Sequence, residues 1–147
     1  MNLSASVSCL GRFCLGLFAV LLFASQTGSQ EDERVVVLFG EPFQKCETFP
    51  EKSTNYELSD KESKEYQVQI LKKRTKGGEE YVWQSREGRL LHYTVSGDWH
   101  IFHAKDGSGY VKVLAVPGEE IVFYMEHIHL QWQTITYWGK AVIGFSP

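Results

Sequence analysis

The chain has 147 residues, of which 43% are hydrophobic, and a formal net charge of −3. This length supports one domain with a sizeable core, and the mildly acidic composition argues against a nucleic-acid partner. After the first thirty residues no segment is long and apolar enough for a membrane-spanning helix, so we expect none in the mature chain.

The first 29 residues have the layout of a secretory signal peptide. Arg12 is the only charged residue in the first twelve, and residues 13–24 form an unbroken apolar stretch that is short for a membrane span. Small residues follow, and Thr27 and Ser29 suit a cleavage site after Ser29. The sequence therefore predicts a signal peptide over 1–29 and a secreted, extracellular mature chain. An uncleaved N-terminal anchor is the alternative.

From residue 35 onward, apolar residues recur with a period close to two, which is typical of β-strands. Turn signals rich in Gly and Pro separate the apolar stretches. Residues 50–63 lack periodicity and are predicted to form a long exposed loop, with one or two helical turns over 58–66 as the alternative. Residues 134–147 are ambiguous. Seven to nine short strands of this kind predict an antiparallel sandwich or barrel. The stronger predicted strands cover residues 35–39, 66–70, 80–84, 90–95, 99–103, 110–116 and 121–130, and a weaker candidate covers 43–49.

Cysteine usage leaves one thiol in the predicted mature chain. Cys9 and Cys14 lie in the predicted signal peptide, so only Cys46 remains and no disulfide can form within the mature chain. A buried inert thiol and a disulfide-linked dimer through Cys46 are both open.

The stretch Asp106-Gly-Ser-Gly-Tyr110 places an acid and a tyrosine four residues apart just before a predicted strand. In an aligned sandwich, a buried tyrosine pins the crossing between the sheets, and an aspartate before it can cap the turn and pair with an arginine. Asp106, Ser108 and Tyr110 fit those roles. They resemble the Asp-x-Gly-x-Tyr signature that opens strand F of immunoglobulin variable-type domains.

The resemblance to the immunoglobulin superfamily implies a two-sheet antiparallel sandwich. It places Cys46 on strand B, Ile70 in the position of the strand C tryptophan, and Lys112 where the second cysteine of the family's bridge would stand. It therefore implies that Cys46 and Ile70 lie close together in the core. The implied organisation is an immunoglobulin-like domain over residues 30–131 and a tail of uncertain structure over 132–147.

The same resemblance implies a recognition module of the immune receptor or adhesion type that binds another protein and does no chemistry. Aromatic residues concentrate at binding hot spots, so Tyr81, Trp83, Tyr124 and Trp132 are candidate partner contacts, although each is also a candidate core residue. The alternative is a closed β-barrel that, like a lipocalin, binds a small apolar ligand in its interior.

Catalytic and metal sites have little support in the sequence. The chain has no Gly-x-Ser-x-Gly elbow, phosphate-binding glycine loop or His-Glu-x-x-His pattern, so we expect no enzyme activity and no cofactor. His127 and His129 share one face of a strand and are the best candidates for metal ligands. Further ligands would have to come from Glu126, Glu119 or His92, and we therefore expect no metal site.

Overall fold

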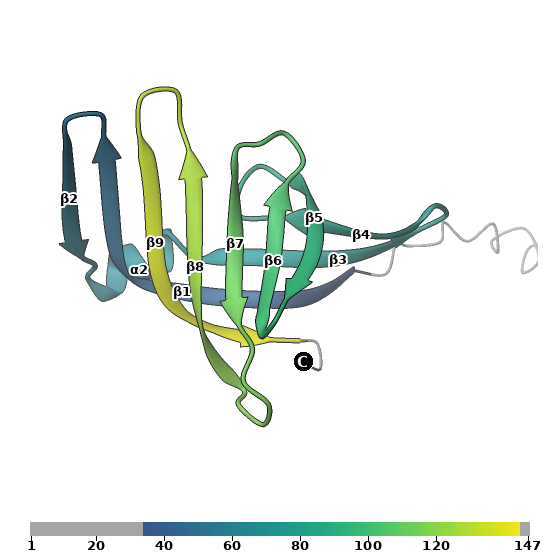
Figure 1. The fold of residues 1–147 in the computed structure, drawn as a ribbon. Helices are drawn as coiled ribbons and strands as arrows, with labels where there is room; N and C mark the ends of the chain where they lie inside the picture. Colours follow the sequence, from purple (N-terminus) through teal and green to yellow (C-terminus); the bar gives the residue numbers. More distant parts are fainter. Residues whose placement is uncertain (1–33, 145–147) are drawn as a thin grey trace, which may run out of the picture. The chain divides into compact units, whose positions relative to one another are not determined.

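The computed structural model describes residues 34–144, within which the chain forms nine β-strands and one short helix (Figure 1). The predicted signal peptide lies outside the described residues. Within them, no helix is long and apolar enough to cross a membrane. The elements are β1 (Arg34–Phe49), β2 (Lys52–Glu57), α2 (Asp60–Glu65), β3 (Val68–Thr75), β4 (Gly78–Trp83), β5 (Arg89–Ser96), β6 (Trp99–Ala104), β7 (Gly109–Leu114), β8 (Ile121–His129) and β9 (Thr134–Ile143).

The strands form one antiparallel sheet that closes on itself. The strand order is β2-β1-β3-β4-β5-β6-β7-β8-β9, and β9 also pairs with β1, so eight strands make a barrel and β2 extends the sheet at β1. The all-β prediction is confirmed, but the predicted two-sheet immunoglobulin-like sandwich is wrong. Closure depends on β9, which pairs with β1 from Ile143 opposite Leu38 to Thr134 opposite Thr48. The sequence predicted no strand in that segment.

β1 is a long strand that changes partners along its length. Its N-terminal part pairs with β3, its middle and C-terminal parts pair with β9, and its end also pairs with β2. The turn predicted at residues 40–42 does not form, and the register against β9 shifts between Pro42 and Gln44 instead. Proline has no backbone N–H to donate, so an irregularity beside Pro42 accommodates it without ending the strand.

The segment predicted as a long exposed loop contains β2 and α2. The helix begins with a capping box: the Glu62 N–H donates to the Ser59 hydroxyl (3.4 Å), and the Ser59 N–H donates to the Glu62 carboxylate (2.9 Å). The Ser63 hydroxyl donates to the Pro42 carbonyl (2.5 Å) and ties the helix to β1. The Ser59-x-x-Glu62 spacing is a sequence signal for this helix that apolar periodicity does not show.

The core of the barrel is built from every second residue of its strands, because neighbouring side chains on a strand point to opposite faces. Most of these residues are aliphatic or aromatic. The buried cluster comprises Val37, Leu38, Val68, Ile70, Trp83, Leu91, Phe102, Ala104, Val111, Val113, Val122, Tyr124 and Ala141. One charged residue, Glu126, is buried to the same degree.

The turn before β7 confirms part of what the sequence predicted. The Ser108 N–H donates to Asp106 Oδ1 (2.9 Å), and Asp106 Oδ2 lies 3.9 Å from Arg89 Nε, so Asp106 caps the turn and faces an arginine. The prediction that Tyr110 is buried at a sandwich corner is wrong. Tyr110 projects from the outer face of β7 and stacks on the His127 ring at a centroid distance of 4.9 Å.

The predicted packing of Cys46 against Ile70 is also wrong. Ile70 is fully buried and pairs with Leu38 and Trp83, whereas Cys46 lies farther along β1, between Asn55 of β2 and Thr136 of β9. Lys112 projects outward and places its ammonium 4.9 Å from the centre of the Trp99 ring. Because the barrel has no second sheet opposite β1, positions 46 and 112 do not face each other across a core.

Candidate functional site

Glu126 is a buried carboxylate on the inward face of β8. It has no solvent exposure, and the inward residues before it on the strand, Val122 and Tyr124, are also buried. The Trp83 indole Nε1–H donates to Glu126 Oε1 (3.1 Å), and Arg86 Nη2 donates to Glu126 Oε2 (2.7 Å). The Arg86–Glu126 pair therefore spans from the β4–β5 turn to the interior of β8.

Burial raises the pKa of the Glu126 carboxyl to about 7, while the charge of Arg86 and the hydrogen bonds from Arg86 and Trp83 act in the opposite direction. Such a pair is weak evidence for a purely stabilising role, since removing two charges from water costs about as much as their attraction returns. A buried, perturbed carboxyl beside a concave surface is instead a candidate functional group.

The β4–β5 turn brings Arg86 back over the end of the barrel. The backbone N–H groups of Arg86 and Gly88 both donate to the Trp83 carbonyl at 3.1 Å. Glu87 and Gly88 have φ values of 58° and 71°, in the left-handed region. Gly88 adopts that conformation without steric cost, which explains a glycine at this position. The sequence predicted a turn here but attached no role to Arg86.

Two buried polar atoms beside this pair have no hydrogen-bond partner among the described residues: Arg86 Nε and the Tyr124 hydroxyl. Leaving a buried donor or acceptor unpaired costs about 1–3 kcal/mol. Burial, and after it the Glu126 carboxylate, raises the pKa of Tyr124, so its hydroxyl stays protonated and able to donate. The interior thus holds two unused hydrogen-bonding groups, one of them on Arg86.

The Tyr124 ring is held in a slot between two glycines on neighbouring strands. A Cβ at Gly40 would lie 2.6 Å from Tyr124 Cε1, and a Cβ at Gly139 would lie 2.4 Å from the same atom. Distances this short are essentially not found in folded proteins. Gly40 of β1 and Gly139 of β9 therefore create the space that Tyr124 occupies.

Tyr137 connects the Arg86–Glu126 pair to β1. The Arg86 guanidinium lies 5.8 Å from the centre of the Tyr137 ring, and Lys45 Nζ lies 6.0 Å from it. Lys45 also forms an ion pair with Glu47 (2.6 Å) and lies 5.3 Å from the centre of the Tyr66 ring. Aromatic faces attract cations, so Tyr137 contributes to holding both side chains in place.

A hollow of about 280 Å³ opens at this end of the barrel, and we call it the mouth hollow. Its apolar walls come from β4, β8 and β9, and its polar residues come from the β4–β5 turn and the start of β5. Glu126 is not among its lining residues. The lining residues are Trp83, Ser85, Arg86, Glu87, Arg89, Ile128, Leu130 and Ile135.

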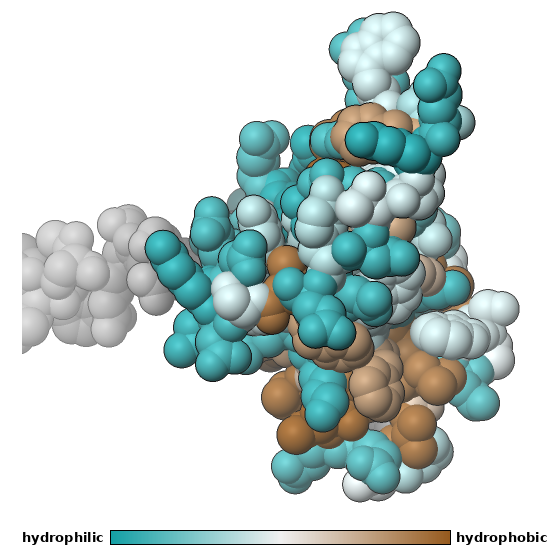
Figure 2. All heavy atoms as spheres, turned by 90° about the vertical axis from the view of Figure 1, so that its left-hand side faces the viewer, coloured by the Kyte–Doolittle hydropathy of each residue, from teal (hydrophilic) through white to brown (hydrophobic). Residues whose placement is uncertain are grey.

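A second, larger hollow of about 590 Å³ lies on the outside of the barrel, between α2 and the sheet. Its lining includes Phe43 and Phe123 together with Glu41, Lys64 and Lys140. Figure 2 shows that apolar residues gather in the lower part of one face of the molecule. No buried unpaired polar atom belongs to this outer hollow, so the mouth hollow is the better candidate site despite its smaller size.

The predicted metal-ligand candidates are placed on the outer surface. His127 and His129 make an edge-to-face contact with ring centroids 4.7 Å apart, and His127 Nδ1 is hydrogen-bonded to the Thr136 hydroxyl (2.9 Å). Glu126 points to the opposite face of β8 and cannot join them. Within residues 34–144 no group of three or more His, Cys, Asp or Glu side chains is placed to hold a metal ion.

The four aromatic residues proposed as partner contacts occupy different environments. Trp83 and Tyr124 are buried inside the barrel, where Trp83 contributes to the site described above. Tyr81 packs in an aromatic cluster, with ring-centroid distances of 5.1 Å to Tyr93 and 5.4 Å to Phe102. Trp132, in the β8–β9 connection, is 74% exposed and remains a prediction for partner contact.

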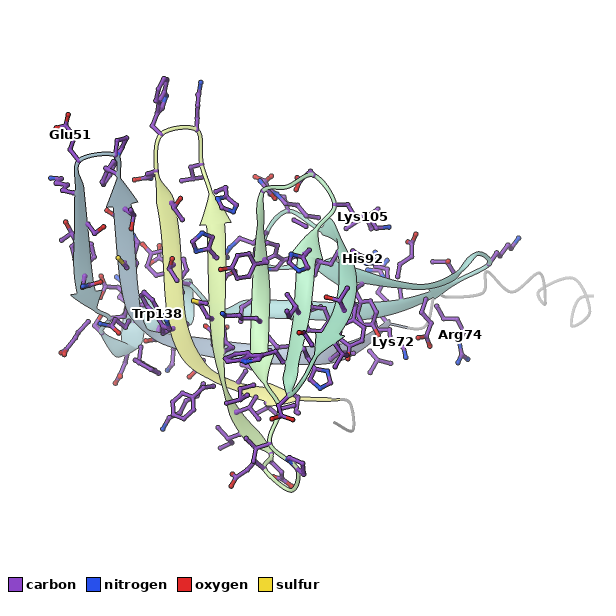
Figure 3. The ribbon with its side chains drawn as sticks, in the orientation of Figure 1. Glu51, Lys72, Arg74, His92, Lys105 and Trp138 are labelled. Carbon is purple, nitrogen blue, oxygen red and sulfur yellow. The ribbon has the colours of Figure 1, made fainter. Side chains whose placement is uncertain are left out.

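Figure 3 labels several ionisable side chains of the barrel. Lys72 and Arg74 lie on the β3–β4 hairpin, which extends away from the barrel, and Lys105 lies in the β6–β7 connection. His92 lies on β5, on the outward-facing side of the strand. None of these side chains lines the mouth hollow, so its cations are Arg86 and Arg89.

No known family model matches the chain, and no curated protein or solved structure is similar enough to count as a match. The comparisons therefore do not support membership of the immunoglobulin superfamily. The site has to be interpreted from its own geometry.

Proposed function

We propose that this protein is a non-enzymatic binding protein that takes up a small amphipathic molecule at the mouth hollow. The observation that carries the proposal is the buried Arg86–Glu126 pair beside a hollow with apolar walls. Small-molecule sites are typically concave and mostly apolar, with a few placed polar groups, and open ends of β-barrels are frequent locations for them.

The volume of the hollow limits the size of the ligand. About 280 Å³ lies just below the range of roughly 300–1,000 Å³ that is typical of ligand pockets. A short alkyl chain or a single ring system suits this volume. The walls formed by Trp83, Ile128, Leu130 and Ile135 would contact the apolar part, and the β4–β5 turn would contact the polar part.

Export and association remain separate proposals. The predicted signal peptide would make this an extracellular binding protein, and N-terminal sequencing of exported material should begin near Gln30.

Recognition of a protein partner is a second candidate function, favoured by the exposed Trp132. Cys46 is a free, partly exposed thiol, so the solution mass with and without reductant would test a disulfide-linked dimer.

The mouth hollow can be tested with the neutral fluorescent probe prodan, whose single ring system is a naphthalene. Leu130→Glu adds a charge to the wall of the hollow, where apolar contact is expected, and should weaken probe binding. Leu90→Glu is the matched control, because Leu90 has similar exposure (42% against 45% for Leu130) but does not line the hollow. Equal loss of binding in both variants, or no binding by the unmodified protein, would contradict the proposal.

A further inference from the structure

We infer that the ligand of the mouth hollow carries an anionic group, such as a carboxylate, which Arg86 and Arg89 bind, while its apolar part packs on Ile128, Leu130 and Ile135. This inference rests on the proposed function and adds the chemical class of the ligand. It comes from the charges that line the hollow, the unused donor on Arg86 and the inaccessibility of Glu126.

The cations at the hollow are placed to meet a ligand. Arg86 and Arg89 both line it, and Arg89 has no ion-pair partner closer than Glu87 at 3.7 Å and Asp106 at 3.9 Å. The Glu87 side chain is 85% exposed and therefore held loosely. Contacts of this length between solvated groups are weak, so a ligand anion can compete for Arg89.

Arg86 has a hydrogen-bond donor to spare. Its Nη2 donates to Glu126, its Nη1 donates to the Ser85 carbonyl, and its buried Nε has no acceptor among the described residues. A guanidinium presents its N–H groups as a planar fork that matches carboxylate and phosphate oxygens. Because the Nε–H has no solvent exposure, an anionic oxygen in the hollow would satisfy it only after Arg86 turns away from Glu126.

A cationic ligand fits this site less well. The carboxylates near the hollow are Glu87, which lines it but is 85% exposed and lies 3.7 Å from Arg89, and Glu126, which has no solvent exposure and does not line it. Both of its oxygens already accept hydrogen bonds, one from Trp83 and one from Arg86. A cation would have to displace Arg86 to reach it, whereas an anion meets Arg86 first.

Glu126 competes with the ligand for Arg86, which makes binding sensitive to pH. The ionisable groups around Glu126 are Arg86 from the β4–β5 turn, Tyr124 on β8 and Tyr137 on β9, with Lys45 on the far side of Tyr137. The two tyrosines have raised pKa values, mainly because of burial, and stay neutral. Protonation of Glu126 would therefore leave Arg86 as an unopposed cation for the ligand.

The test compares octanoate, octanol and octylamine by titration calorimetry at pH 6 and pH 8. The three probes share one alkyl chain, and octanoate stays ionised over this range. We expect octanoate to bind most tightly. Its Kd should rise by up to about tenfold from pH 6 to pH 8, because the protonated fraction of a carboxyl with a pKa of about 7 falls about tenfold between these two pH values.

Two variants test the contributions of Glu126 and Arg89 to octanoate binding, and a third is the control. Glu126→Gln keeps an acceptor for Trp83 but removes the competing charge, so octanoate should bind at pH 8 as tightly as it binds the unmodified protein at pH 6. Arg89→Gln should weaken octanoate binding by about threefold, the effect expected for an exposed charge pair, and leave octanol binding unchanged. Lys76→Gln is the matched control, since Lys76 is exposed in the β3–β4 turn, away from the hollow.

The outcomes distinguish the two proposals. Octanol binding as tightly as octanoate would overturn the anionic class but leave a small-molecule function intact. Preference for octylamine would also overturn it. Failure of all three probes and of the neutral fluorescent probe would overturn the proposed function. Octanoate binding that keeps its pH dependence in Glu126→Gln would show that Glu126 is not the competing group, which overturns the inferred arrangement around Arg86.

Discussion

Glu126 makes the stability of the folded chain depend on pH in the direction opposite to a carboxylate whose pKa is lowered on folding. Its pKa is raised from 4.5 to about 7 in the folded state, so the folded state holds the proton more strongly than the unfolded chain does. The contribution of Glu126 to stability is therefore fully present below about pH 4.5 and is lost as pH rises through 7.

We predict that the free energy of unfolding falls between pH 5 and pH 8. The part of this fall that Glu126 causes should be on the order of 3 kcal/mol, because one pKa unit corresponds to about 1.4 kcal/mol. Urea unfolding at both pH values measures it. Glu126→Gln should lack this part of the pH dependence. The same fall in both proteins would mean that other groups cause it.

The two glycines around Tyr124 allow a double-mutant test of the slot. Gly40→Ala should cost about 1–3 kcal/mol by overpacking, because the new Cβ meets only side-chain atoms, those of Tyr124 and Val68. In a Tyr124→Ala background the cost of Gly40→Ala should shrink, which unfolding experiments on the four proteins would measure as a coupling energy.

Gly139→Ala is the contrasting case. Its Cβ would lie 2.3 Å from the Glu41 carbonyl oxygen and 2.7 Å from Pro42 Cα, and these backbone atoms remain when Tyr124 is shortened. Tyr124→Ala should therefore not rescue Gly139→Ala. Equal rescue of both alanine variants would show that the Tyr124 ring, rather than β1 backbone, limits the space at both positions.

At the scale of elements, α2 depends on its capping box rather than on burial, since none of its residues is buried. Ser59→Ala removes the hydroxyl that accepts from the Glu62 N–H and should destabilise the helix by about 1 kcal/mol. Amide hydrogen exchange should accelerate within residues 60–66 and stay unchanged in the barrel strands. Ser53→Ala, on exposed β2, is the control and should leave α2 exchange as it was.

β9 is the element that closes the barrel, and its loss should prevent folding. A chain that ends at residue 131 keeps every strand that the sequence predicted strongly but leaves β1 and β8 without their shared partner. We expect it to lack a cooperative unfolding transition, measured by near-ultraviolet circular dichroism. A chain that ends at Gly144 retains β9 and should fold. Cooperative unfolding of the shorter chain would contradict the role of β9.

The sequence predicted the central strands well because one face of each is buried. Along β6, β7 and most of β8, every second residue is more deeply buried than its neighbours, and these short segments are rich in β-branched and aromatic residues, which locates strands without any knowledge of their partners. β2 was missed because both of its faces are largely exposed. The sequence predicts a strand end at Pro42 because local sequence does not show that a bulge is available.

At the scale of the whole molecule, the choice between sandwich and barrel could not be made from strand patterns, since both demand alternating strands joined by turns. The choice depends on the pairing of the first and last strands, which is a long-range contact. The candidate site could not be predicted from the sequence for a related reason. Glu126 interrupts an inward row of apolar residues, which is a visible signal, but its partner Arg86 lies forty residues earlier in a turn.

Closure by β1 and β9 also sets an order of events during folding. Hairpins such as β5–β6 and β6–β7 join neighbouring segments and can form early, whereas the ring is completed only when the two ends of the described chain meet. Pairings between distant segments are slow because the entropy of the intervening chain must be lost first. During synthesis, the barrel therefore cannot close until its last strand has left the ribosome, and Glu126 stays accessible to water until that moment.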